Sequence, residues 1–108
     1  MEKLEQTPQL EQLFNEIKQL SRKEPKTLEQ MALKLSEEAG ETSQAVLSAL
    51  NASGSGYKQL GLEDVKEECV DVILVALAMF HKLSDQDGEL TRLLGEKMSK
   101  WAAKMGSA

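Results

Sequence analysis

The sequence has few of the residues that stabilise small secreted domains or bind metals through sulfur. Its 108 residues include a single cysteine, Cys69, so one chain can form neither a disulfide framework nor a thiolate metal cluster. A reducing cytoplasm is the expected setting. Only two prolines occur, and 41% hydrophobic with 29% charged residues is the composition of an ordinary folded protein. We expect one domain, residues 1–108, with a core of about 7–104.

Long apolar runs and basic clusters are also missing. The longest apolar stretch, 69–80, is shorter than the roughly 20 residues that span a bilayer, and residues 1–6 lack the apolar core of a signal peptide. We therefore expect a soluble, cytoplasmic protein without a membrane partner. The net charge of −5 and the absence of a lysine or arginine cluster argue against polymeric nucleic acid as a partner. A small polyanion such as a nucleotide can still bind if a divalent cation mediates.

No segment shows the alternation of a half-buried strand, and four segments show helical periodicity, so we predict an all-α fold. The first helix is expected to begin at Thr7-Pro8, an N-cap followed by a first-turn proline, and to end near Lys23. The second begins with a capping box between Thr27 and Gln30 and runs to about residue 50.

A Gly/Ser-rich connection, 51–61, is long enough to let a third helix, about 62–83, fold back beside the second. After a turn over 84–88, a fourth amphipathic helix follows. Its apolar positions are Leu90, Leu93, Leu94, Met98 and Trp101.

Two of these helices are apolar on more than one side. On the second helix, Leu33 and Leu47 emerge nearly opposite Leu35, and the third helix is apolar all round after Cys69. One chain of this size cannot bury all of this surface. We therefore predict a homo-oligomer, either a homodimer or a homotetramer.

Carboxylates occur in two pairs with helical spacing. Glu38 and Glu41 are neighbours on the second helix, and Glu68 and Asp71 repeat the i, i+3 spacing on the third. Asp71 is the one strongly polar side chain between residues 69 and 80, so we expect it to have little solvated surface. Closely spaced buried carboxylates require a neutralising cation. An all-oxygen site suits Mg²⁺, Mn²⁺ or Ca²⁺.

The two pairs also form a familiar pattern. The sequence Glu37-Glu38-Ala39-Gly40-Glu41, followed after 26 residues by Glu68-Cys69-Val70-Asp71, resembles the EExxE and ExxD motifs of the MazG-like all-α nucleotide pyrophosphohydrolases. The resemblance covers roughly residues 28–80 and implies a four-helix MazG-like bundle that forms a homo-oligomer. It also implies hydrolysis of a nucleoside triphosphate, with a deoxynucleotide as the expected substrate. The products would be the monophosphate and pyrophosphate, and the role house-cleaning of the nucleotide pool.

The resemblance further implies roles for individual residues. Glu38, Glu41, Glu68 and Asp71 match the Mg²⁺ ligands of the family, with Mn²⁺ as a substitute ion. Glu37 would position or deprotonate a water, so Glu37 and Glu38 are the candidate catalytic residues. From their places on the fourth helix, we consider three further residues as candidate substrate contacts, with a solvated helix face and a core tryptophan as the alternative interpretation. These residues are Lys97, Lys100 and Trp101.

Two other functions remain open from the sequence. A phosphoribosyl-ATP pyrophosphohydrolase would share the metal motif. A non-enzymatic acidic oligomerisation module would instead have Asp71 facing solvent or a lysine such as Lys66 or Lys82. The preferred base is undetermined, because the fourth helix lacks the asparagine and arginine-rich stretch of many members, and Val75 stands where some relatives carry an aromatic residue.

Overall fold

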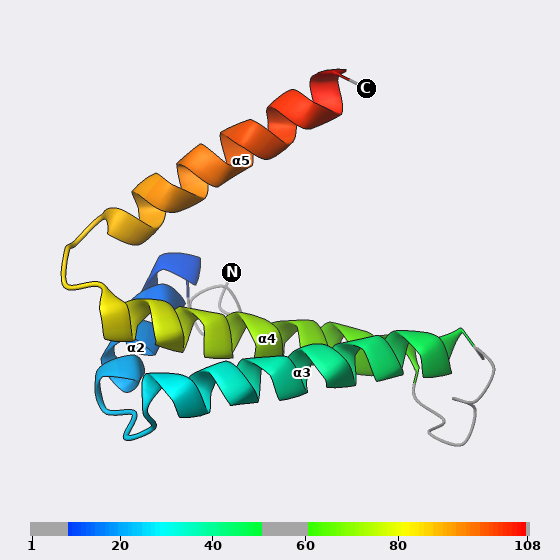
Figure 1. The fold of residues 1–108 in the computed structure, drawn as a ribbon. Helices are drawn as coiled ribbons and strands as arrows, with labels where there is room; N and C mark the ends of the chain where they lie inside the picture. Colours follow the sequence, from blue (N-terminus) through cyan, green and yellow to red (C-terminus); the bar gives the residue numbers. More distant parts are fainter. Residues whose placement is uncertain (1–8, 51–60, 108) are drawn as a thin grey trace, which may run out of the picture.

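The computed structural model describes residues 9–50 and 61–107, and all regular structure in these ranges is helical. Its four helices are α2 (Leu10–Arg22), α3 (Leu28–Ala49), α4 (Leu62–Leu83) and α5 (Glu89–Ser107) (Figure 1). The predicted all-α fold is confirmed, and so are the four helical segments. The predicted start of the first helix at Thr7-Pro8 lies outside the described residues. None of the helices in the described ranges is long and apolar enough to cross a membrane.

Local side-chain bonds explain where α3 and α4 begin. The Thr27 hydroxyl accepts a bond from the Gln30 amide nitrogen at 3.1 Å, and Gln30 Oε1 accepts one from the Thr27 amide at 2.9 Å. The predicted capping box is thus confirmed. At the start of α4, Asp64 Oδ2 accepts a bond from the Gly61 amide at 2.8 Å. The Gln30 amide oxygen and the Asp64 carboxylate thus accept from backbone amides that have no partner inside the helix.

The helices α3 and α4 lie side by side and antiparallel, and they form the main contact of the structure (Figure 1). Helix α2 packs against α4 as the second contact. Ile17 and Leu20 of α2 lie near Leu74 and Ala78 of α4, around a small hollow, so α2 covers the second half of α4. The first half of α4 therefore has only α3 as a described helical neighbour.

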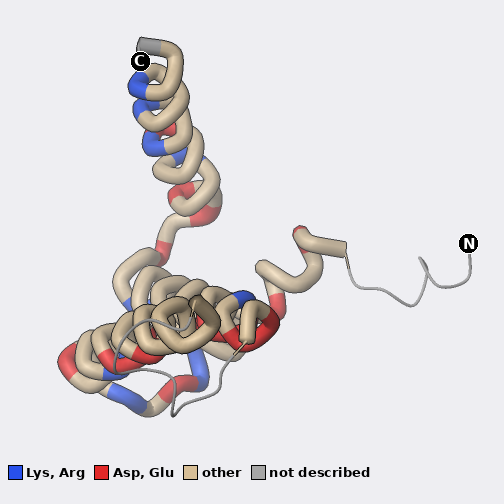
Figure 2. The backbone as a smooth tube through the Cα atoms, turned by 90° about the vertical axis from the view of Figure 1, so that its right-hand side faces the viewer, with Lys and Arg blue, Asp and Glu red and all other residues tan. Residues whose placement is uncertain are grey.

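Helix α5 projects away from the other three helices (Figures 1 and 2). The turn before it is held by an ion pair between Lys18 Nζ and Asp87 Oδ1 at 2.7 Å and by a hydrogen bond from the Ser84 hydroxyl to the Glu89 carboxylate. Gly88 has φ 83°, a conformation that other residues rarely adopt. Among the helices of the described residues, α2, α3 and α4 therefore pack together, and α5 does not join them in the single chain as expected.

The described part of the chain has a small core and much exposed apolar surface. The buried hydrophobic residues are Met31, Ala45 and Leu77. Helix α4, which was expected to be buried on every side, has several apolar side chains in solvent in the single chain, and α3 and α5 expose more. The exposed residues of these three helices include Leu33, Leu47, Val70, Ile73, Leu94, Met98, Trp101 and Met105.

Candidate metal centre

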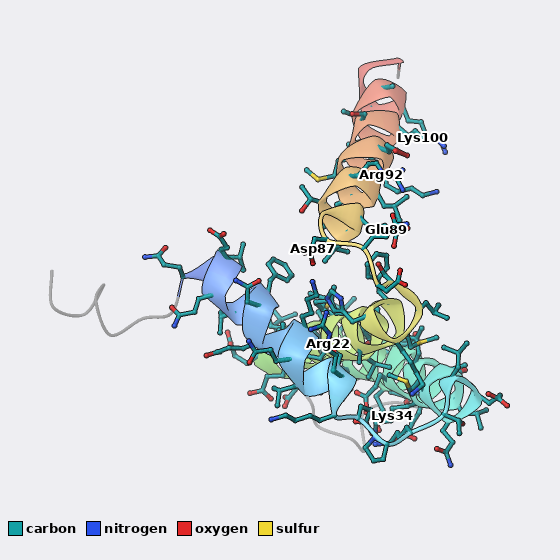
Figure 3. The ribbon with its side chains drawn as sticks, turned by 90° about the vertical axis from the view of Figure 1, so that its left-hand side faces the viewer. Arg22, Lys34, Asp87, Glu89, Arg92 and Lys100 are labelled. Carbon is teal, nitrogen blue, oxygen red and sulfur yellow. The ribbon has the colours of Figure 1, made fainter. Side chains whose placement is uncertain are left out.

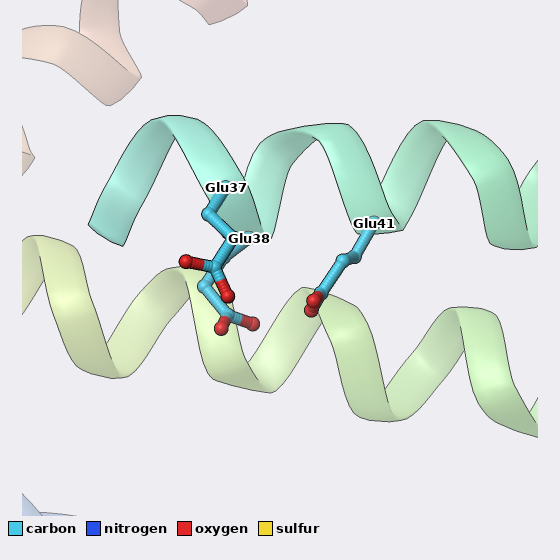
Figure 4. A group of neighbouring side chains, drawn as sticks. All are labelled: Glu37, Glu38 and Glu41. Atoms are coloured by element: carbon cyan, nitrogen blue, oxygen red, sulfur yellow. The ribbon is translucent and has the colours of Figure 1, made fainter. Parts of the chain in front are cut away.

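Three glutamates of α3 extend from the side of the helix that lies next to α4. Figure 4 shows Glu37, Glu38 and Glu41 with their carboxylates over the α4 ribbon. One oxygen from each of the three lies within 4.8 Å of the others. Since 3.6 residues make one turn, residues 37 and 41, or 38 and 41, come back to neighbouring positions on the helix surface. The i, i+3 and i, i+4 spacings therefore place these three carboxylates side by side, as the sequence predicts.

Two carboxylates of α4 complete the group. Oxygens of Glu38, Glu68 and Asp71 also lie within 4.8 Å of one another, so Glu38 belongs to both sets. The structure thus places the five predicted carboxylate residues in two neighbouring groups that share Glu38, along the contact between α3 and α4. We call Glu37, Glu38, Glu41, Glu68 and Asp71 the carboxylate cluster.

Two oxygens of the carboxylate cluster are buried without a hydrogen-bond partner. Glu38 is only 6% exposed, and within residues 9–50 and 61–107 neither its Oε2 atom nor Oε2 of Glu68 has a hydrogen-bond partner. A buried carboxylate oxygen without a donor costs free energy that folding does not normally leave unmet. Both atoms belong to residues whose oxygens approach each other, so one cation between the helices would satisfy them together.

The electrostatics of Glu68 agree with this arrangement. Burial raises the pKa of its carboxyl above the usual 4.5, and the negative charges of Glu41, Asp71 and Glu38 raise it further. In this environment the ionised form of the Glu68 carboxyl is less stable, relative to its protonated form, than it would be in water. A divalent cation would reverse the effect, because it offsets the neighbouring negative charges.

The expected burial of Asp71 is wrong for the single chain, in which Asp71 is exposed as the alternative of a non-enzymatic oligomerisation module predicts. Its side chain is exposed, since α3 covers only one side of α4 at this level and α2 lies over the other half of the helix. The buried carboxylate oxygens that favour a bound cation are therefore those of Glu38 and Glu68. Asp71 still contributes a carboxylate oxygen close to theirs.

Sequence reasoning missed one residue at this place, Lys34. Its ammonium lies 3.0 Å from Glu38 Oε1 and 3.4 Å from Glu37 Oε1, and its position on α3 can be followed in Figure 3. Hydrogen bonds to Glu38 and Glu37, with their charges, raise the pKa of Lys34 above 10.5. The signal was available, because Lys34 stands four residues before Glu38 and three before Glu37, both of which are contact spacings on a helix.

The candidate substrate contacts on α5 are not brought to the carboxylate cluster. Lys97, Lys100 and Trp101 are exposed, and Trp101 keeps 65% of its surface in solvent. Figure 2 shows the lysines toward the C-terminal end of α5, apart from the acidic residues of α3 and α4. In the single chain these residues therefore have no contact with the candidate site.

A separate hollow of about 420 Å³ lies where α2, the end of α4 and the start of α5 meet. Phe14, Phe80 and Leu90 line it together with His81, and no residue of the carboxylate cluster does. The Nε2 atom of His81 is buried there without a partner. Burial lowers the pKa of His81 below 6.5, and the charges of Lys18 and Arg22 lower it further.

Comparison of the chain with protein-family models, with curated proteins and with solved structures finds no match. The family resemblance of the two motifs therefore stays a prediction. The carboxylate cluster offers only hard oxygen donors from two facing helices. Such a donor set suits Mg²⁺ and Mn²⁺ and does not favour zinc.

Proposed function

We propose that this protein is a Mg²⁺-dependent nucleoside triphosphate pyrophosphohydrolase that cleaves a nucleotide, most simply a deoxynucleoside triphosphate, to the monophosphate and pyrophosphate. One observation carries the metal part of the proposal: Glu38 and Glu68, from different helices, each leave a buried oxygen without a partner at the same place. The resemblance of the EExxE and ExxD motifs supports the reaction class. Removal of unwanted nucleotides from a cytoplasmic pool is the role that follows.

The oxygen donors of the carboxylate cluster suit Mg²⁺. Glu38, Glu41, Glu68 and Asp71 would hold Mg²⁺, or Mn²⁺ as its substitute, because Glu38, Glu68 and Asp71 offer oxygens close together from both helices and Glu41 adjoins Glu38. The bound ion would supply charge neutralisation at the triphosphate and make a water more acidic. Without that neutralisation an acidic protein would repel a polyphosphate.

Glu37 is suited to proton transfer. Its side chain is more exposed than that of Glu38 and its carboxylate stands at the solvent edge of the carboxylate cluster. It can accept the proton of the attacking water while the anhydride bond between the α and β phosphates breaks and pyrophosphate leaves with the bonding electrons. Glu38 lies beside it and has oxygens in both carboxylate sets, so it would orient ligand and water together.

We further propose that the protein works as a homodimer or homotetramer. Residues of α3, α4 and α5 keep large apolar side chains in solvent, among them Leu33, Ile73 and Trp101. A second copy of the chain is the simplest partner, because the same surfaces would be covered on both copies by one symmetric contact. Assembly would also complete the predicted bundle, with α5 as one of its helices.

The test of the enzymatic proposal is pyrophosphate release from a panel of deoxynucleotides, ribonucleotides and phosphoribosyl-ATP in the presence of Mg²⁺. The native chain would be compared with Glu41→Gln and Asp71→Asn. Glu63→Gln is the matched control, because Glu63 is an exposed acid of α4 that pairs with Lys66 outside the carboxylate cluster. We expect release by the native chain and the control, with at least about tenfold lower rates in the two site variants.

The panel also separates the alternatives. Pyrophosphate release from phosphoribosyl-ATP alone would identify that compound as the substrate, and the proposed reaction site would be unchanged. No release from any substrate would remove the enzymatic proposal and leave an acidic helical oligomerisation module. Equal rates in Asp71→Asn and the native chain would show that the carboxylate cluster is not the reaction centre.

A further inference from the structure

Lys34 stands between the carboxylate cluster and solvent. Its ammonium contacts Glu38 Oε1 at 3.0 Å and Glu37 Oε1 at 3.4 Å, while the lysine side chain itself is 42% exposed. The contact therefore joins a half-exposed cation to a buried carboxylate. Such a contact can be broken from the solvent side without opening the interface between α3 and α4.

Within residues 9–50 and 61–107, Lys34 is the cation that forms ion pairs with these carboxylates. The carboxylate cluster has five acidic residues, and the Lys34 ammonium contacts two of them, Glu37 and Glu38. The other oxygen of Glu38 has no partner, and its carboxylate is the one shared by both sets. A divalent cation that binds Glu38 would therefore compete with Lys34 for the same negative charge.

The ammonium has room to move once that contact weakens. Lys34 also lines a hollow of about 210 Å³, together with Lys26 and with Met31 of α3. Glu24 and residues of α4 complete the lining, and one of the α4 residues, Val75, follows Asp71 by one turn. The hollow therefore adjoins the carboxylate cluster. A lysine has a flexible four-carbon stem, so its ammonium can leave Glu38 and still remain at this edge.

We propose that Lys34 exchanges partners when ligand binds. It neutralises Glu37 and Glu38 in the ion-free protein, and it is displaced by the divalent cation to bind an oxyanion of the polyphosphate held beside that cation. This inference rests on the proposed function and deepens it by linking the two binding steps. Because the cation frees the ammonium that the polyphosphate needs, each ligand raises the affinity for the other.

The test measures the two steps separately by titration calorimetry on the full chain. Mn²⁺ alone is titrated first, and inorganic pyrophosphate is then titrated at saturating Mn²⁺. The variants are Lys34→Gln and Lys34→Arg, with Lys66→Gln as the matched control, because Lys66 forms a similar i, i+3 ion pair with Glu63 at 2.9 Å on α4. Glutamine is a good helix former at a part-exposed position, so the fold is retained.

Two opposite changes are expected in Lys34→Gln. Mn²⁺ should bind about fivefold tighter because its competitor is gone, and pyrophosphate about tenfold weaker because one charge-assisted hydrogen bond is lost. Lys34→Arg should restore pyrophosphate binding, and Lys66→Gln should match the native chain in both titrations.

The possible results of these titrations distinguish the partner exchange of Lys34 from the proposed hydrolase function. A native chain that binds Mn²⁺ with an affinity equal to that of Lys34→Gln overturns the exchange, even if nucleotides are hydrolysed. Weaker pyrophosphate binding without tighter Mn²⁺ binding also overturns it, since no competition then exists. A native chain that binds no Mn²⁺ overturns both proposals. The two expected changes without any pyrophosphate release from nucleotides would keep the exchange and reject the hydrolase.

Discussion

Glu38 of α3 and Glu68 of α4 meet across the contact between the two helices, and each has a buried oxygen with no hydrogen-bond partner. The two residues lie 30 positions apart in the sequence, so the antiparallel packing of α3 and α4 creates this relationship. A cation bound at this place would contact carboxylates of both helices.

Glu68→Gln should stabilise the ion-free protein at neutral pH. The pKa of Glu68 is raised in the folded state, so the native chain binds this proton more tightly than the unfolded chain. Folding stability should therefore increase as the pH falls through the raised pKa toward 4.5. The variant, which carries no charge there, should melt at a higher temperature than the native chain at neutral pH and show a flatter pH dependence. A lower melting temperature in Glu68→Gln than in Glu63→Gln would contradict this account.

Thr27→Ala should lower the free energy of unfolding by about 1 kcal/mol, since it removes the hydroxyl that accepts from the Gln30 amide at the start of α3, while the bond from the backbone amide of residue 27 to Gln30 Oε1 can remain. Urea denaturation measures the loss. Thr27→Ser keeps a hydroxyl acceptor and should retain most of the stability. Equal losses in the two variants would mean that the methyl group of the threonine matters and the cap does not.

His81 should titrate below 6.5. Burial is the larger cause, and the positive charges of Lys18 and Arg22 add to it. Because it is the only histidine, its imidazole proton signals can be followed by nuclear magnetic resonance without assignment. Lys18→Gln should move the pKa of His81 up toward 6.5, whereas Lys26→Gln should leave it unchanged.

The same shift has a consequence for stability. The folded state binds the His81 proton less tightly than the unfolded chain, so stability is complete above 6.5 and decreases as the pH falls from 6.5 through the lowered pKa. A pKa of His81 at or above 6.5 would contradict the described packing around the hollow between α2, α4 and α5.

Trp101 should report assembly. In the single chain it is largely exposed on α5, next to Met98 and Met105, so its fluorescence at high dilution should be that of a solvated tryptophan. At higher protein concentration the emission should move to shorter wavelength as a second copy covers α5. Met98→Glu should prevent the shift, because it places a charge in the apolar stripe. A monomer mass by sedimentation at all concentrations would reject the homo-oligomer.

Local rules predicted most of the helices and the spacing of the carboxylates. The capping box at Thr27 and the acidic residues at i, i+3 are short-range features, and both are present as expected. The departure of α5 and the exposure of Asp71 depend on which helices pack together, which periodicity does not determine. Lys34 was within reach of the same local pattern, because it stands three residues before Glu37 and four before Glu38.

Cation binding itself is the most direct test of the account. Calorimetric titration of Mg²⁺ into the native chain, Glu38→Gln and Asp71→Asn should show saturable binding to the native protein and at least about tenfold weaker binding to both variants, with Glu63→Gln unchanged. Saturable binding of equal affinity in all four proteins, or none in the native chain, would contradict the claim that the carboxylates of α3 and α4 form a metal centre.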